Sequence, residues 1–85
     1  MLSKNADEVV RSIKENMTHE DNIVSVLEII YPDGEKDVSL VEIDEGNNNE
    51  VVYSEFVSKD VSIEDIKKSL DSENIKNNHE TIYEK

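Results

Sequence analysis

The chain has 85 residues, of which 21 are acidic and nine are basic, so its formal net charge is −12 at pH 7. This length allows one domain with one modest core and is too short for a deep, enclosed active site. Clustered Lys and Arg, which contacts to phosphate need, are lacking, and this excludes direct binding of nucleic acid. We therefore treat residues 1–85 as a single small acidic domain.

The absence of cysteine excludes a disulfide framework and a thiolate metal site, and it favours a reducing, cytoplasmic location. No apolar run approaches the length of a membrane span. Residues 1–5 lead into a charged amphipathic segment without an apolar signal region. We therefore expect a cytoplasmic protein that is not inserted in a membrane.

Residues 6–17 predict the first helix. Apolar side chains recur there at helical spacing, Asn5 is a suitable N-cap residue, and Glu8 follows it three residues later. The polar stretch from Thr18 to Asn22 then predicts a connecting loop. The apolar stripe consists of Ala6, Val9, Val10, Ile13 and Met17.

Three strands are expected next. Ile23 to Tyr31 is rich in β-branched and aromatic residues, and Pro32-Asp33-Gly34 supplies the residues of a turn. Lys36 to Ile43 is the return strand, residues 44–49 form the next turn, and Glu50 to Ser58 is the third strand. Together they predict a three-stranded antiparallel β-meander.

The first of these strands is apolar on both faces. Such a strand lies in the middle of a sheet or is covered by helices. The pattern does not determine which face of the other two strands points inward. One face carries Val24, Val26 and Ile30 together with Glu28, and the other carries Ile23, Leu27, Ile29 and Tyr31.

A second helix is predicted from about Ile63 to Asp71. Ser62 is its N-cap, and Val61 and Ile66 are spaced as a hydrophobic staple. Beyond residues 72–74, helical spacing resumes in Ile75, His79, Ile82 and Tyr83, although Asn77-Asn78 disfavours a helix. The chain is therefore predicted to be α+β, with an N-terminal helix, the meander and one or two C-terminal helices. The order of the final residues is left open.

The negative charge is concentrated between residues 15 and 58. Twelve acids stand there against the single base Lys36, which gives −11, whereas residues 1–14 and 59–85 contribute +1 and −2. Acids at alternate positions of a strand that rises about 3.3 Å per residue approach the charge spacing of a nucleic-acid backbone. The residues assigned to this partner-binding surface are Asp33, Glu35, Asp37, Glu42, Asp44, Glu45 and Glu50. Acids also serve solubility alone in many small domains, and this alternative stays open.

Catalytic and metal sites find no support in the sequence. His19 and His79 are sixty residues apart and have no cysteine to complete a zinc pattern. The acidic turn at residues 44–50 has its glycine in the third position, where an EF-hand loop needs it in the sixth. No Ser, His and acid form a nucleophile motif. We therefore expect no enzyme activity, cofactor or metal.

The order of a helix, a meander and C-terminal helices in a very acidic chain of this size resembles the small phage-encoded anti-CRISPR inhibitors and other DNA mimics. Asp33-Gly34-Glu35 in the first turn and Asp44-Glu45 in the second match positions where one type II-A anti-CRISPR class also places acidic residues. In that class they occupy the basic DNA-reading groove of Cas9. The resemblance implies an inhibitor that acts in the host cytoplasm on a nuclease such as Cas9.

Two functional hypotheses follow. The first is an inhibitor or regulator whose acidic sheet docks on a basic, normally nucleic-acid-binding, surface of another protein. The alternative is a non-catalytic adaptor or subunit that binds through apolar helix faces, while its acids maintain solubility. A charge-driven complex weakens steeply as salt rises, whereas an apolar interface does not.

Overall fold

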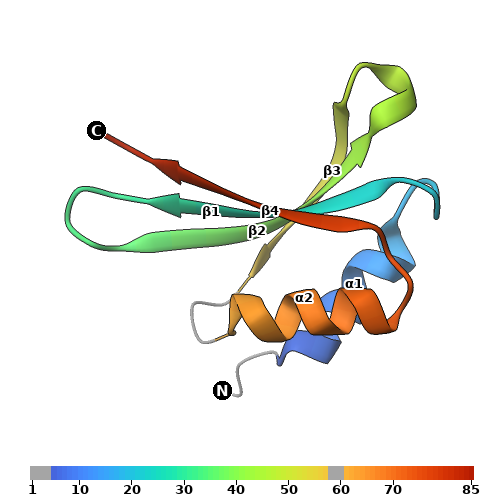
Figure 1. Ribbon diagram of the computed structural model, residues 1–85, viewed down its shortest axis with the longest axis horizontal. Coiled ribbons are helices and arrows are strands. Elements are labelled where there is room, and N and C mark those ends of the chain that lie inside the picture. Colours follow the sequence, from blue (N-terminus) through green and yellow to red (C-terminus); the bar gives the residue numbers. More distant parts are fainter. Residues whose placement is uncertain (1–4, 58–60) are drawn as a thin grey trace.

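The computed structural model describes residues 5–57 and 61–85 and has two layers, a four-stranded sheet and a pair of helices. Both helices lie on the same side of the sheet (Figure 1). The helices are α1 (Ala6–Asn16) and α2 (Ile63–Ser72). The strands are β1 (Ile23–Ile30), β2 (Lys36–Asp44), β3 (Glu50–Val57) and β4 (Asn77–Tyr83), and a 3-10 turn, η1 (Glu45–Asn47), lies between β2 and β3.

The strand order in the sheet is β3–β2–β1–β4. β2 pairs antiparallel with both β1 and β3, whereas β4 pairs parallel with β1. Antiparallel neighbours are joined by short turns, but a parallel strand needs a longer crossover, and α2 provides it between β3 and β4. The sheet is therefore mixed and four-stranded. The predicted three-stranded antiparallel meander is wrong, although the α+β class is correct.

The segment after α2 is a strand, so the prediction of helical structure there is wrong. Asn74 ends α2 with a φ of 60°, and the Ile75 N–H donates to the Leu70 carbonyl at 3.0 Å, which closes a Schellman motif. The chain then runs alongside β1, where Val24 N–H donates to the Lys76 carbonyl at 2.9 Å. Pairing with β1 satisfies the backbone of this segment and outweighs its helical spacing.

The predicted starts of both helices are confirmed. The Asn5 side chain accepts a hydrogen bond from the Glu8 N–H at 2.9 Å, and the Ser62 hydroxyl accepts one from the Asp65 N–H at 3.4 Å. The first hairpin turn is confirmed as well, because Gly34 has a φ of +90°, which an L side chain rarely adopts. The predicted end of the third strand, Ser58, lies outside the described residues.

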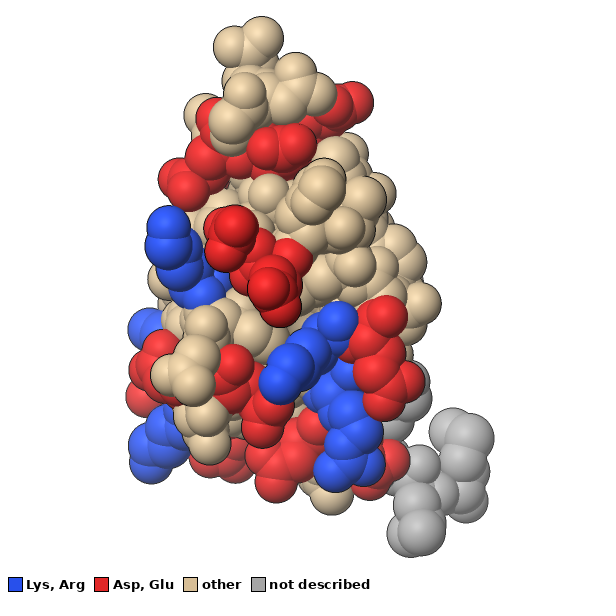
Figure 2. Space-filling model, turned by 90° about the vertical axis from the view of Figure 1, so that its right-hand side faces the viewer, with Lys and Arg blue, Asp and Glu red and all other residues tan. Residues whose placement is uncertain are grey.

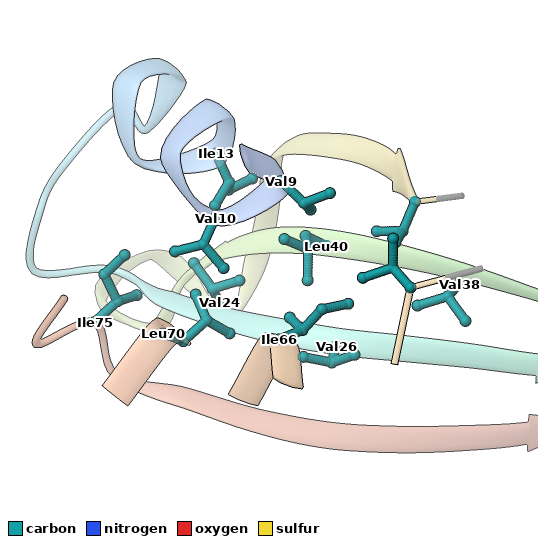
Figure 3. Close-up of a cluster of buried hydrophobic side chains, with 12 residues drawn as sticks. Val9, Val10, Ile13, Val24, Val26, Val38, Leu40, Ile66, Leu70 and Ile75 are labelled. Atoms are coloured by element: carbon teal, nitrogen blue, oxygen red, sulfur yellow. The ribbon is translucent and has the colours of Figure 1, made fainter. Parts of the chain in front are cut away.

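The hydrophobic core fills the space between the helices and one face of the sheet (Figure 3). α1 and α2 each turn their apolar stripe towards it, because side chains three and four residues apart share a helix face. The fully buried side chains include Ile13, Leu40, Ile66 and Leu70. The other residues of the hydrophobic core are Val9, Val10, Val24, Val26, Val38, Val57, Val61 and Ile75.

Candidate protein-interaction surface

The seven carboxylates predicted to form one surface do not come together. Successive turns of antiparallel strands lie at opposite ends of the sheet, so Asp33 and Glu35 are separated from Glu45 and Glu50 by the length of β2 (Figure 1). Seven residue steps at about 3.3 Å give roughly 23 Å between positions 37 and 44. The structure therefore splits the predicted surface into two acidic ends.

Several of these carboxylates shape their own turns. Asp33 accepts a hydrogen bond from the Glu35 N–H at 3.0 Å, and Asp44 accepts one from the Gly46 N–H at 3.1 Å. Short acidic side chains that accept a bond two residues ahead fix a turn locally. Asp37 is half-buried and accepts a hydrogen bond from the Tyr31 hydroxyl at 2.7 Å, which raises the pKa of Tyr31.

Glu42 does not belong to any exposed surface, so its assignment as a partner-binding residue is wrong. Its side chain is 0% exposed, because Val38, Leu40 and Glu42 alternate along β2 towards the helices. One carboxylate oxygen accepts from the Asn22 amide at 2.8 Å, and the two oxygens accept from the Thr18 N–H at 2.9 and 3.0 Å. The His19 N–H adds a bond of 3.1 Å. Glu42 thereby fixes the loop between α1 and β1 to the sheet.

The pKa of Glu42 reflects two opposing effects. Burial alone raises the pKa of this carboxyl, because it penalises the charged form. The hydrogen bonds donated by Thr18, Asn22 and His19 together outweigh burial and hold the pKa of Glu42 below its ordinary value. Glu42 is therefore an ionised, fully bonded structural group and has no role on the surface.

A second polar group lies on the helix side of the sheet, where β1, β2 and β4 extend beyond the helices (Figure 1). Glu28 accepts from Lys36 at 3.1 Å and from the Thr81 hydroxyl at 3.1 Å, and His79 Nε2 lies 3.3 Å from it. Burial raises the pKa of Glu28, but these partners outweigh burial and lower it. The described residues contain no group of three or more His, Asp or Glu arranged to hold a metal ion.

A cleft with a volume of about 630 Å³ lies between the end of α1, the following loop and the end of α2. Lys14 and Glu73 form an ion pair of 2.7 Å across it, and Met17 and His19 line it. Its walls combine opposite charges and apolar groups without a converging set of reactive side chains. We assign no chemistry to this cleft.

One end of the sheet carries two exposed acids, Glu20 and Asp21, in addition to those that the sequence had indicated. Ile23 pairs with Ile43, so the loop before β1 lies at the same end as the turn after β2. We call this the acidic end, and it consists of Glu20, Asp21, Asp44, Glu45 and Glu50. Segments 18–22 and 44–50 contain no Lys or Arg, although Lys76 precedes β4 at the same end. Glu20 and Asp21 were missed because only the strand register brings the loop to the second turn.

The charge pattern differs between the two layers. Figure 2 shows Lys and Arg alternating with Asp and Glu over the lower part of one face, where the helices lie. The top of that face, which is the turn between β2 and β3, shows acidic side chains without Lys or Arg (Figure 2). The mixture of opposite charges therefore compensates the helical layer more than it compensates the acidic end.

The sheet face opposite the helices carries more apolar than polar side chains, and none of the described elements covers it (Figure 1). We call it the open face. Its uncharged polar members are Ser25, Ser39, Ser54 and Asn78. Its most exposed apolar side chains are Phe56, 73% exposed, Val51, 58% exposed, and Ile82, 45% exposed. A bulge at Val52 brings Val51 opposite Ile43 on this face. Its other apolar members are Ile23, Leu27, Ile29, Val41 and Ile43.

The fold is thus a two-layer α+β domain with one open sheet face. Neither described helix is long or apolar enough to cross a lipid bilayer. Comparison of the chain with protein-family models, with curated protein sequences and with solved structures gives no match. The acidic end and the open face are the two candidate interaction surfaces of this fold.

Proposed function

We propose that this protein is a non-catalytic inhibitor or regulator that binds a basic, normally nucleic-acid-binding, surface of another protein. The observation that supports the proposal is the acidic end, where carboxylates from two separate chain segments lie at the same end of the sheet. Close carboxylates repel one another and destabilise the fold unless cations compensate. A partner rich in Lys and Arg provides that compensation and is attracted from a distance.

The form of nucleic-acid mimicry differs from the one expected from the sequence. An exposed row of acids along β2 is not available, because Glu42 is buried and Asp37 is half-buried. In our proposal the turn and loop carboxylates, Glu20, Asp21, Glu45 and Glu50, take the places of phosphates. An inhibitor of the anti-CRISPR type, directed at a nuclease such as Cas9, would be one case of this class.

The competing hypothesis of an adaptor that binds through apolar helix faces loses its proposed surface. Val9, Val10 and Ile13 of α1 and Ile66 and Leu70 of α2 are buried against the sheet. Exposing them to a partner would require the two layers to separate. An adaptor of this kind would have to use another part of the molecule.

Affinity capture tests the proposed function. The tagged protein is incubated with a cell lysate at low salt, and bound proteins are eluted either with high salt or with duplex DNA. We expect both eluents to release the same proteins, and the released proteins to bind DNA themselves, because they compete through one basic surface. Captured proteins that resist both eluents would contradict the proposal.

A pair of charge-matched variants locates the binding surface. The acidic-end variant carries Glu20→Lys, Asp21→Lys and Glu45→Lys. Its control carries Glu8→Lys, Glu64→Lys and Asp65→Lys in the helical layer, and all six positions are exposed. Both variants have the same net charge, so a general charge effect weakens capture equally. We expect capture to be lost only in the acidic-end variant, and circular dichroism should show that both variants are folded.

A further inference from the structure

The open face lacks the charge that covers the rest of the molecule. Charged residues make up 35% of the chain, yet the strand positions that point to this face carry only Asp37 and Glu80 as charged side chains among the described residues. A solvated face of an antiparallel sheet ordinarily alternates towards polar residues. Exposed apolar side chains gathered on one face of a chain this acidic are typical of an interaction site.

The open face has a dry centre and projecting edges. Ser25 is 3% exposed and Val41 is also buried, because neighbouring side chains of the same face surround them. Phe56 and Val51 on β3 and Ile82 on β4 project from the two outer strands. Covering these exposed apolar side chains with a partner removes apolar surface from water, which favours association.

A small hollow joins the open face to the acidic end. It has a volume of about 240 Å³ and is lined by Ile23, Ile43, Glu45 and Glu80, together with Asn49 and Asn78. Arg and Lys bury their aliphatic stems on apolar surface while their charged heads stay near water or an anion. The two isoleucines and two glutamates suit such a side chain.

We propose that the open face is the docking site of the partner, and that this partner presents an apolar patch flanked by Lys and Arg. This inference rests on the proposed function and specifies its site. Acids flank the apolar face at both ends, with Asp33 and Glu35 at one end and the acidic end at the other. A second copy of this chain would bring like charges together at both ends, so charge complementarity favours a different, basic partner.

The open face is large enough to form the centre of an interface but too small to form all of it. About 23 Å along β2 and four strands about 4.8 Å apart give a projected area of roughly 400 Å². A stable interface buries about 800 Å² on each partner, so the apolar face forms its centre and the flanking acids complete it. Because the core lies on the other side of the sheet, the fold does not require the projecting apolar groups.

The test uses a synthetic amphipathic peptide with a leucine face flanked by arginines. Two control peptides replace its arginines by glutamates or its leucines by serines. The face variant carries Val51→Thr, Phe56→Thr and Ile82→Thr, which keep β propensity and remove exposed apolar surface. We expect the wild-type protein to bind the first peptide at least about tenfold more tightly than either control, and both the face variant and the acidic-end variant to lose about tenfold in affinity.

Each other outcome overturns a defined part of the account. Loss in the acidic-end variant alone would leave the proposed function intact and remove the open face as its site. Loss of peptide affinity in the face variant alone would support the open face as the docking site but contradict a partner rich in Lys and Arg. Wild-type binding that does not distinguish the peptides would contradict the inference. Sedimentation that shows a wild-type dimer and a monomeric face variant would make the open face a self-association surface and contradict it as well.

Discussion

Glu42 accepts hydrogen bonds from the backbone and side chains of a single loop, and this makes it the most informative residue for stability. We predict that Glu42→Gln lowers the free energy of unfolding by about 1–3 kcal/mol. The glutamine NH₂ group would face the N–H groups that now donate to the carboxylate, so some of these donors would lose their acceptor. Urea denaturation measures the change. Glu45→Gln, at an exposed position, serves as the control and should change stability little.

The lowered pKa of Glu42 also predicts how stability depends on pH. A carboxyl whose pKa is lower in the folded state than the unfolded value near 4.5 stabilises the fold above that value. This stabilisation is lost as pH falls through the folded pKa, because the unfolded state binds the proton first. Unfolding free energies measured from pH 6 down to about pH 3 should fall less steeply in Glu42→Gln than in the wild type. Parallel curves would contradict the assigned role.

The alternation of residues along β2 was sufficient to predict the burial of Glu42. Val38, Leu40 and Glu42 occupy alternate positions of one strand, so an inward face for the first two places the third inside as well. The acidic character of the segment favoured a reading in which every carboxylate was exposed. The hydrogen-bond donors of Glu42 could not be predicted from the sequence. Thr18 and Asn22 lie at least 20 residues from Glu42 in the chain, and only the folded structure brings them into contact with it.

At the level of the elements, the end of α2 decides whether the last segment becomes helix or strand. Asn74 has a φ of 60°, a conformation that Asn tolerates and glycine adopts freely, whereas β-branched residues do not. We predict that Asn74→Val lowers the free energy of unfolding by about 1 kcal/mol or more, whereas Asn74→Gly leaves it unchanged or raises it. Thermal unfolding compares the two variants. Equal destabilisation by both would contradict the Schellman motif.

The elements that depend on local sequence were predicted well, and those that depend on distant pairing were not. Asn5 and Ser62 mark the helix starts through a bond three residues ahead, which a sequence displays directly. A signal for the end of α2 was present in Asn74, a residue type that tolerates the positive φ of a Schellman motif. The parallel pairing of β4 with β1 has no local signature, because it depends on the crossover through α2.

At the scale of the whole molecule, the sequence located the negative charge correctly along the chain but not in space. Antiparallel geometry alone places the two acidic turns at opposite ends of β2. The register of β1 on β2 was needed to place Glu20 and Asp21 at the same end of the sheet as the second turn. The sequence showed that both faces of β1 are apolar. The face that carries Leu27 and Ile29 points away from the helices, and no described element covers it.

The most direct test of the account is a map of the contact surface by nuclear magnetic resonance. The ¹⁵N-labelled protein is titrated with the arginine- and leucine-bearing peptide, or with a partner once it has been captured, and amide shifts are followed residue by residue. We predict that the largest shifts fall on Leu27, Val41 and Phe56 of the open face and on Glu20 and Glu45 of the acidic end, with α1 and α2 little changed. Shifts confined to the two helices, or spread evenly over all exposed acids, would contradict it.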